Sequence, residues 1–155
     1  NQAITYWVEL QATDSDGLSW AIERKVRFTR LHAAYADAIS GFKVLSGTGG
    51  SDEPAVMVSS RAGDYIGWHG LNLTGRNPLF VQAAAGAVGG SLEIRLDDPA
   101  GELLGTIALD EADAWKTAFI PISVDGVHDL YLVTSGDGSV VAQVHWIQLV
   151  GPGIQ

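Results

Sequence analysis

The sequence predicts an all-β protein, a two-sheet β-sandwich of the jelly-roll type that carries an N-terminal β-hairpin. Three observations support this prediction. Apolar and polar residues alternate in many short runs, which is the period of a strand with one buried face. These runs recur at intervals of about ten residues, as in sandwiches and jelly rolls. Nineteen glycines are spread through the 155 residues, and few segments show a helical period.

The first 28 residues predict a hairpin that precedes the sandwich. Residues 4–12 and 18–26 alternate with the same period, and an Asp-Ser-Asp-Gly run between them supplies a turn. We expect Trp20 to pack this hairpin onto the sandwich. The segment is interpreted as a hairpin or as the remnant of an upstream linker module, and residues 29–151 as the sandwich domain.

The remaining elements follow in order along the chain. Residues 28–42 have apolar residues at helical spacing before Gly41, so a short helix competes there with extended structure. Residues 43–54 are rich in Gly, Ser and acidic residues and predict a loop. Strands are expected at residues 55–58, 64–73, 78–85, 92–97, 103–109, 117–124, 129–134 and 140–150.

The hairpin near the middle of the chain shows the alternation most clearly. Within residues 92–96 the apolar side chains are expected to face the core, whereas Glu93 and Arg95 face solvent. The Asp-Pro-Ala-Gly run that follows has turn chemistry, and residues 103–109 return as a second apolar run.

Composition excludes several classes of partner. The net charge is −9 and only nine residues are Lys or Arg, which argues against nucleic acid and against an anionic membrane surface. No stretch approaches the length of a membrane-spanning helix. The chain has no cysteine, so disulfides and thiolate metal sites are excluded. The chain begins without a signal-peptide pattern, and we interpret it as a mature or excised piece.

A series of motifs occurs in a fixed order across residues 31–150. They are Ser40-Gly41-Phe42, Gly63-Asp64-Tyr65, Gly89-Gly90, the hairpin at residues 92–106, Trp115, residues 126–133 and His145-Trp146. In this order and spacing the chain resembles the family 6 carbohydrate-binding modules. The resemblance implies a jelly-roll fold without catalytic activity. It also implies polysaccharide binding, either in a cleft at the loop tips or on the concave face of one sheet.

For the loop-tip cleft, the resemblance implies that Trp115 and Gln143 contact the sugar. Trp115 stands at the family's sandwiching tryptophan, and an indole face packs well against the C–H face of a pyranose. Gln143 stands where the family has a hydrogen-bonding Asn, and its amide both donates and accepts. Ser59 stands at the family's second stacking aromatic, so this cleft has lost one of its two walls.

For the concave face, the resemblance implies a role for Tyr65, which matches the aromatic that lines this site in the family. Glu93 is expected on the wet side of a nearby strand. Either side chain has a plain structural alternative, as a sheet aromatic or a solvated charge. Trp68 is expected in the core.

The resemblance also implies a structural calcium, but the family's usual ligands are replaced. The positions of its N-terminal glutamates fall on the run that includes His32 and Ala34, and the ligand near the last strand falls on His145. Calcium prefers hard oxygen ligands, which imidazole and alanine do not supply. We therefore expect the calcium site to be lost or rebuilt, and calcium is the one cofactor that the resemblance leaves open. The two histidines are too few to hold a transition metal.

The predicted function is non-catalytic binding of polysaccharide or oligosaccharide through aromatic stacking and hydrogen bonds. The domain would be covalently linked to further domains of a larger bacterial protein, secreted or on the cell surface, and would target it to its substrate. The alternative is a structural or adhesive β-sandwich that binds protein rather than sugar.

An enzyme is not predicted. Asp97 and Asp98 are adjacent, so on a strand they point to opposite faces and do not flank one glycosidic bond. No Gly-x-Ser-x-Gly elbow is present.

Overall fold

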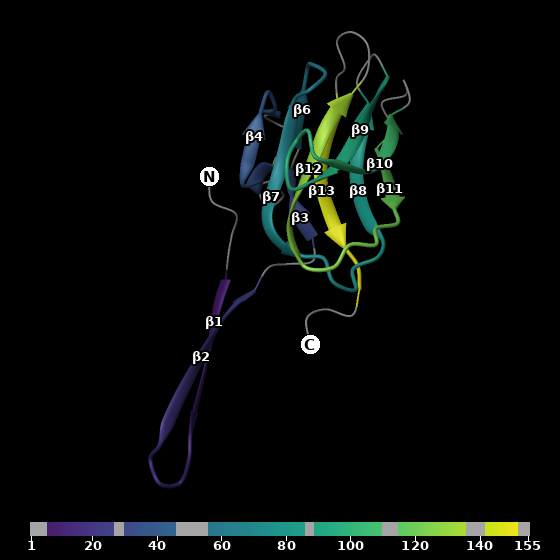
Figure 1. Ribbon diagram of the computed structural model, residues 1–155. Coiled ribbons are helices and arrows are strands. Elements are labelled where there is room, and N and C mark those ends of the chain that lie inside the picture. Colours follow the sequence, from purple (N-terminus) through teal and green to yellow (C-terminus); the bar gives the residue numbers. More distant parts are fainter. Residues whose placement is uncertain are drawn as a thin grey trace.

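The protein is a two-sheet β-sandwich with an N-terminal hairpin, which confirms the predicted fold class (Figure 1). The computed structural model describes residues 6–26, 30–45, 56–85, 89–109, 115–135 and 142–151, without the side chains of residues 6–8 and 23–26. No helix in this part of the chain is long and apolar enough to cross a membrane.

The described elements are thirteen strands and one short 3-10 helix. They are β1 (Tyr6–Thr13), β2 (Ser19–Val26), β3 (Arg30–His32), η1 (Ala33–Tyr35), β4 (Ala38–Ser40), β5 (Lys43–Leu45), β6 (Val56–Ser59), β7 (Tyr65–Asn72), β8 (Leu79–Ala85), β9 (Gly90–Leu96), β10 (Glu102–Leu109), β11 (Lys116–Ile120), β12 (Val127–Ser135) and β13 (Ala142–Leu149).

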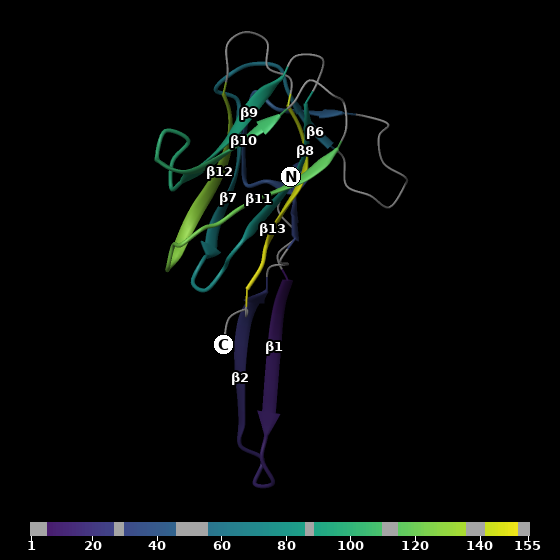
Figure 2. The same ribbon diagram turned by 90° about the vertical axis from the view of Figure 1, so that its right-hand side faces the viewer.

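Two antiparallel sheets face each other. One has the strand order β10-β9-β12-β7-β4, and the other has the order β11-β8-β13-β6-β5, with β3 paired to β13. We call them the five-stranded and the six-stranded sheet. Both are seen edge-on in Figure 2, which is turned by 90° from Figure 1.

The core lies between the two sheets and takes every second residue of the central strands. Leu92 and Ile94 of β9 are fully buried, while Glu93 between them is half-buried on the outer face. The prediction from the sequence alternation, that the apolar residues of this strand face the core and Glu93 faces outward, is therefore confirmed. Trp68 on β7 is 1% exposed, so the expectation that it belongs to the core is also confirmed.

The ambiguous segment at residues 28–42 is extended rather than helical in the part described. Leu31 pairs with Ile147 of β13 and Ile39 pairs with Ile66 of β7, so one strand of this segment joins each sheet. Only the three residues of η1 are helical. Pairing with the two sheets has overridden the local helix preference, because intrinsic helix propensity is weak compared with tertiary contacts.

Two predicted boundaries were wrong. Lys43–Leu45 was expected in a loop but forms β5, which pairs with β6; residues 46–55 lie outside the described part. The strand expected to run to residue 124 ends at Ile120, because Pro121 has no N–H to continue the ladder.

The hairpin β1–β2 forms a sheet of its own and projects from one end of the sandwich in both views (Figures 1 and 2). Its eight paired positions run from Tyr6 and Val26 to Thr13 and Ser19. Trp20 is 61% exposed, so the expectation that it packs the hairpin onto the sandwich was wrong. A two-stranded ribbon that stands alone has no second layer of structure against which to bury such a side chain.

Candidate functional site

The outer face of the five-stranded sheet carries Tyr65 and Glu93, two of the four predicted binding residues. Tyr65 begins β7, Glu93 lies in the middle of β9, and both are in register with Val133 of β12, the strand between them. Since neighbouring strands are about 4.8 Å apart, the two residues stand in one row about 10 Å apart. We call the outer surface of β7, β12 and β9 the tyrosine face.

A second tyrosine adjoins Tyr65 on this face. The Tyr131 ring contacts Tyr65 edge to face, with 5.8 Å between ring centroids. It also lies over Gly67, where a Cβ atom would come within 2.4 Å of a ring carbon. Glycine at this position thus lets the Tyr131 ring lie flat on the sheet, and only 8% of the residue is exposed.

The Tyr131 hydroxyl is part of a polar group at the end of the tyrosine face. It lies 3.1 Å from Nε2 of His69, and that nitrogen is 3.9 Å from Oδ2 of Asp129. The other oxygen of Asp129 accepts a hydrogen bond from the backbone N–H of Gly70. Burial, with a smaller contribution from Asp129, raises the pKa of Tyr131. The hydroxyl therefore remains protonated and can both donate and accept.

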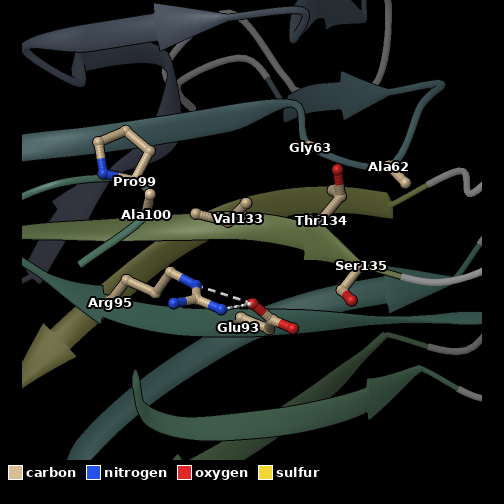
Figure 3. Close-up of a pocket in the computed structure, with 9 residues that line it drawn as sticks. All are labelled: Ala62, Gly63, Glu93, Arg95, Pro99, Ala100, Val133, Thr134 and Ser135. Atoms are coloured by element: carbon tan, nitrogen blue, oxygen red, sulfur yellow. Dashed lines mark hydrogen bonds and ion pairs between the residues drawn. The ribbon is translucent and has the colours of Figure 1, made fainter. Parts of the chain in front are cut away.

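A pocket of about 420 Å³ opens beside this row of side chains (Figure 3). Its size falls within the range of small-molecule sites, about 300–1,000 Å³. It is lined by Ala62, Gly63, Glu93, Arg95, Pro99, Ala100, Val133, Thr134 and Ser135. These residues come from β9, β12 and the two turns that precede β7 and β10, so the pocket has the sheet as its floor and turns as its walls.

Glu93 and Arg95 form an ion pair at the pocket, drawn with dashed lines in Figure 3. Both Nε and Nη2 of Arg95 donate to Oε2 of Glu93, at 2.8 and 2.6 Å, and Nη1 donates to the carbonyl of Gly101 at 2.7 Å. Oε1 of Glu93 accepts no hydrogen bond from the described residues. This oxygen is therefore available to accept a hydrogen bond from a hydroxyl group of a ligand.

The other two predicted residues lie on the outer face of the six-stranded sheet. Trp115 directly precedes β11 and is 42% exposed, and its ring meets that of His145 edge to face at 6.1 Å. Gln143 is half-buried on β13 and pairs with Ala84 of β8. We call this surface the tryptophan face. The four predicted residues thus form two pairs on opposite sides of the sandwich.

The match to known proteins agrees with this architecture. The sequence model of the carbohydrate binding module family 6 matches residues 32–151 of the chain. The chain belongs to this family. The resemblance inferred from the sequence motifs is thereby confirmed, and the domain is a carbohydrate-binding module from a non-catalytic family.

Solved structures of the family share the fold. A family 6 module from Clostridium cellulolyticum, solved with xylose, is 26% identical with a TM-score of 0.66; the match covers 79% of this chain and 97% of that one. A β-1,3-glucan-binding module from Bacillus halodurans is 25% identical (TM-score 0.64, 79% and 95% covered). A module from Clostridium stercorarium, solved with cellobiose, is 23% identical (TM-score 0.65, 80% and 94% covered).

Ser59, which replaces the family's second stacking aromatic, does not face a ligand in this module. It is fully buried, and its hydroxyl lies 3.0 Å from Oδ2 of Asp64 and 3.1 Å from the carbonyl of Arg61. The same carboxylate oxygen accepts hydrogen bonds from the backbone N–H groups of Ser60 and Arg61. Ser59 therefore holds the turn before β7 and supplies no ring to the tryptophan face.

The residues at the family's calcium positions do not fit calcium. The rings of His32 and His145 lie 5.4 Å apart, and Nδ1 of His145 is 3.0 Å from Oε1 of Gln82. Together with Ala34, this set offers imidazole nitrogens where calcium requires carboxylate or carbonyl oxygens. Across the described ranges, no group of three or more His, Asp or Glu residues could hold a metal ion.

Sequence reasoning missed Tyr131, His69 and the turn residues that wall the pocket. The signal for Tyr131 was present, because it is two residues from Val133 on β12 and so shares its face. Without the register of β12 against β7, however, nothing placed it beside Tyr65. The wall at Pro99 depends on how the turn folds over the sheet, which alternation does not predict.

Proposed function

We propose that this module binds polysaccharide on the tyrosine face. The observation that carries the proposal is a pocket that continues into a row of aromatic and polar side chains. Tyr65 supplies a ring for the apolar C–H face of a sugar, and Oε1 of Glu93 supplies a hydrogen-bond acceptor for its hydroxyls. The two lie about 10 Å apart, which leaves room for a sugar unit on Tyr65 and a neighbouring unit at the pocket.

The role of each group follows from its environment. Tyr131 supports the Tyr65 ring from the side, and Val133 provides apolar contact between Tyr65 and Glu93. Arg95 fixes the rotamer of Glu93 and offsets its charge. The site therefore presents a compensated ion pair to the sugar, and binding needs no chemical step on the ligand.

The tryptophan face is the competing location. It is favoured by the 42% exposure of Trp115 and by its ring contact with His145, which lies two residues from Gln143 on β13. We place it second because Ser59 is buried at the end of β6 and does not supply the family's second stacking ring. Stacking on one ring alone gives a smaller apolar contact than a site that also offers a pocket.

Affinity electrophoresis against soluble polysaccharides tests the proposed function. The panel follows the neighbours' ligands and comprises xylan, a β-1,3-glucan and a soluble cellulose derivative. We expect at least one polymer to retard the module relative to a non-binding protein of similar charge. If none does, sugar binding is rejected for this chain and the structural or adhesive β-sandwich takes its place.

We also propose that the module is one part of a larger secreted or cell-surface bacterial protein, which it targets to polysaccharide. The support is the hairpin β1–β2, a separate sheet that lies outside the residues matched by the family model. Proteolysis of the natural protein, followed by mass spectrometry, would reveal further domains attached to this chain. A natural polypeptide that ends at the boundaries of the module would contradict the proposal.

Removal of metal is expected to leave this module unchanged. The family's calcium positions carry His32, Ala34 and His145, which are poor calcium ligands. We therefore expect the midpoint of thermal unfolding and the retardation by polysaccharide to be the same with EDTA as with added calcium. A lower midpoint in EDTA, restored by calcium, would show that a rebuilt site exists.

A further inference from the structure

The turn between β9 and β10, at residues 97–101, forms one wall of the pocket through Pro99 and Ala100. It begins with Asp97, whose φ of 62° lies in the left-handed region that, apart from glycine, chiefly Asn and Asp adopt. Side-chain contacts hold this conformation. One oxygen of the Asp97 carboxylate accepts a hydrogen bond from the backbone N–H of Asp129 at 3.1 Å, and both oxygens lie near Nδ1 of His128.

The His128 ring lies between two groups that can only accept hydrogen bonds. Nδ1 is 2.9 and 3.1 Å from the two carboxylate oxygens of Asp97, and Nε2 is 3.0 Å from the backbone carbonyl of Asp125. A neutral imidazole has one N–H and would leave one of these contacts without a proton. The imidazolium has two N–H groups and satisfies both contacts, so this geometry favours the protonated ring.

The groups around this ring are mostly acidic. The Asp97 carboxylate faces it from the β9–β10 turn and that of Asp129 from β12, while Asp125 offers its backbone carbonyl from the loop before β12. His69 on β7 adjoins the cluster through Asp129. The carboxylates of Asp97 and Asp129 therefore favour a cation at His128, and the nearer, hydrogen-bonded one is Asp97.

We propose that protonated His128 is a positioning residue for polysaccharide binding, which clamps the 97–101 turn against β12 and so holds the pocket wall in place. The proposal rests on the binding function proposed above, because the clamp acts on the wall of that pocket. Within the turn, Gly101 donates to the carbonyl of Asp98, and Arg95 donates to the carbonyl of Gly101. The clamp is thus coupled to the Glu93–Arg95 pair that faces the ligand.

The direction of the pH dependence follows from the two groups. The hydrogen bond to Asp97, followed by that to the Asp125 carbonyl, raises the pKa of His128 above its ordinary value of 6.5. The contribution of His128 is therefore complete below that value and is lost as the pH rises through its raised pKa. The hydrogen bond from His128 lowers the pKa of Asp97 below 3.8, so acid breaks the clamp only as the pH falls through that lowered value.

Two variants and two ligand-free measurements test the clamp. NMR of the ring nitrogens follows the titration of His128, and amide exchange of Ala100 and Gly101 follows the turn. In the wild type we expect His128 to titrate above its ordinary pKa, and the two amides to exchange roughly two- to fivefold faster, beyond the intrinsic pH effect, at about pH 8.5 than at about pH 5.5. His128→Gln should show the faster exchange at both values. In Asp97→Gly, the glycine adopts a positive φ without strain. This variant should keep the turn but remove the pH dependence of the amide exchange.

Binding is then measured with xylotriose, cellobiose and laminarin oligosaccharides at both pH values. We expect the affinity of the wild type to fall about two- to fivefold at the higher pH, and that of His128→Gln to be equal at both. An ordinary titration of His128, or unchanged exchange in His128→Gln, would overturn the clamp. Failure of all sugars to bind while the exchange results hold would instead reject the proposed function and leave the clamp as a structural feature of the turn.

Discussion

Replacement of Tyr65 by alanine is expected to weaken polysaccharide binding by roughly 10- to 100-fold. The tyrosine ring offers a flat apolar surface to the C–H face of a sugar, and alanine leaves Val133 as the remaining apolar group between the strands. Tyr65 is half-buried at the start of β7 and outside the core, so the variant should fold. Isothermal titration calorimetry with the retarding polysaccharide, or with an oligosaccharide of it, measures the change.

Two matched variants make this result interpretable. Tyr65→Phe keeps the ring and should retain most of the affinity, because stacking rather than the hydroxyl carries the interaction. Trp115→Ala removes the exposed ring of the opposite face and should leave the affinity unchanged. The reverse pattern, with Trp115→Ala impaired and Tyr65→Ala intact, would move the site to the tryptophan face.

Replacement of Gly67 by valine is expected to destabilise the module by about 1–3 kcal/mol and to impair binding as well. A Cβ atom at this position would stand 2.4 Å from one carbon of the Tyr131 ring and 2.5 Å from another. The ring must therefore leave its place on the sheet, and Tyr65 loses the edge-to-face contact that supports it. Urea denaturation measures the loss of stability, and calorimetry measures the loss of affinity.

A double variant separates this clash from the intrinsic cost of valine in the strand. Combined with Tyr131→Ser, which removes the ring, Gly67→Val should cost much less than it does alone, so the two changes should be strongly non-additive. If the two losses of stability simply add, the position of the Tyr131 ring on the sheet does not depend on Gly67, and the proposed packing of the ring on this residue is wrong.

Much of the fold followed from local patterns in the sequence. Alternation over residues 92–96 predicted both the buried face of β9 and the outward position of Glu93. Ordered motifs from Ser40 to Trp146 led to the correct family. These features are local or lie at characteristic spacings, so they can be read without knowledge of the strand pairing.

The rest depends on contacts between distant segments. Leu31 lies in a strand because Ile147 is there to pair with it, and a local helix preference gave no sign of that partner. The site shows the same limit, since Tyr65 and Tyr131 are brought together by the β7–β12 register. For Trp20, the sequence showed an apolar hairpin face but not whether anything covers it.

The most direct test of the binding site is a chemical-shift map of the backbone amides during titration with an oligosaccharide of the retarding polymer. We predict that the shifts cluster at Tyr65, Glu93, Val133 and Ala100, on the tyrosine face and its pocket wall. Shifts that cluster instead at Trp115 and Gln143, with the tyrosine face unperturbed, would contradict it.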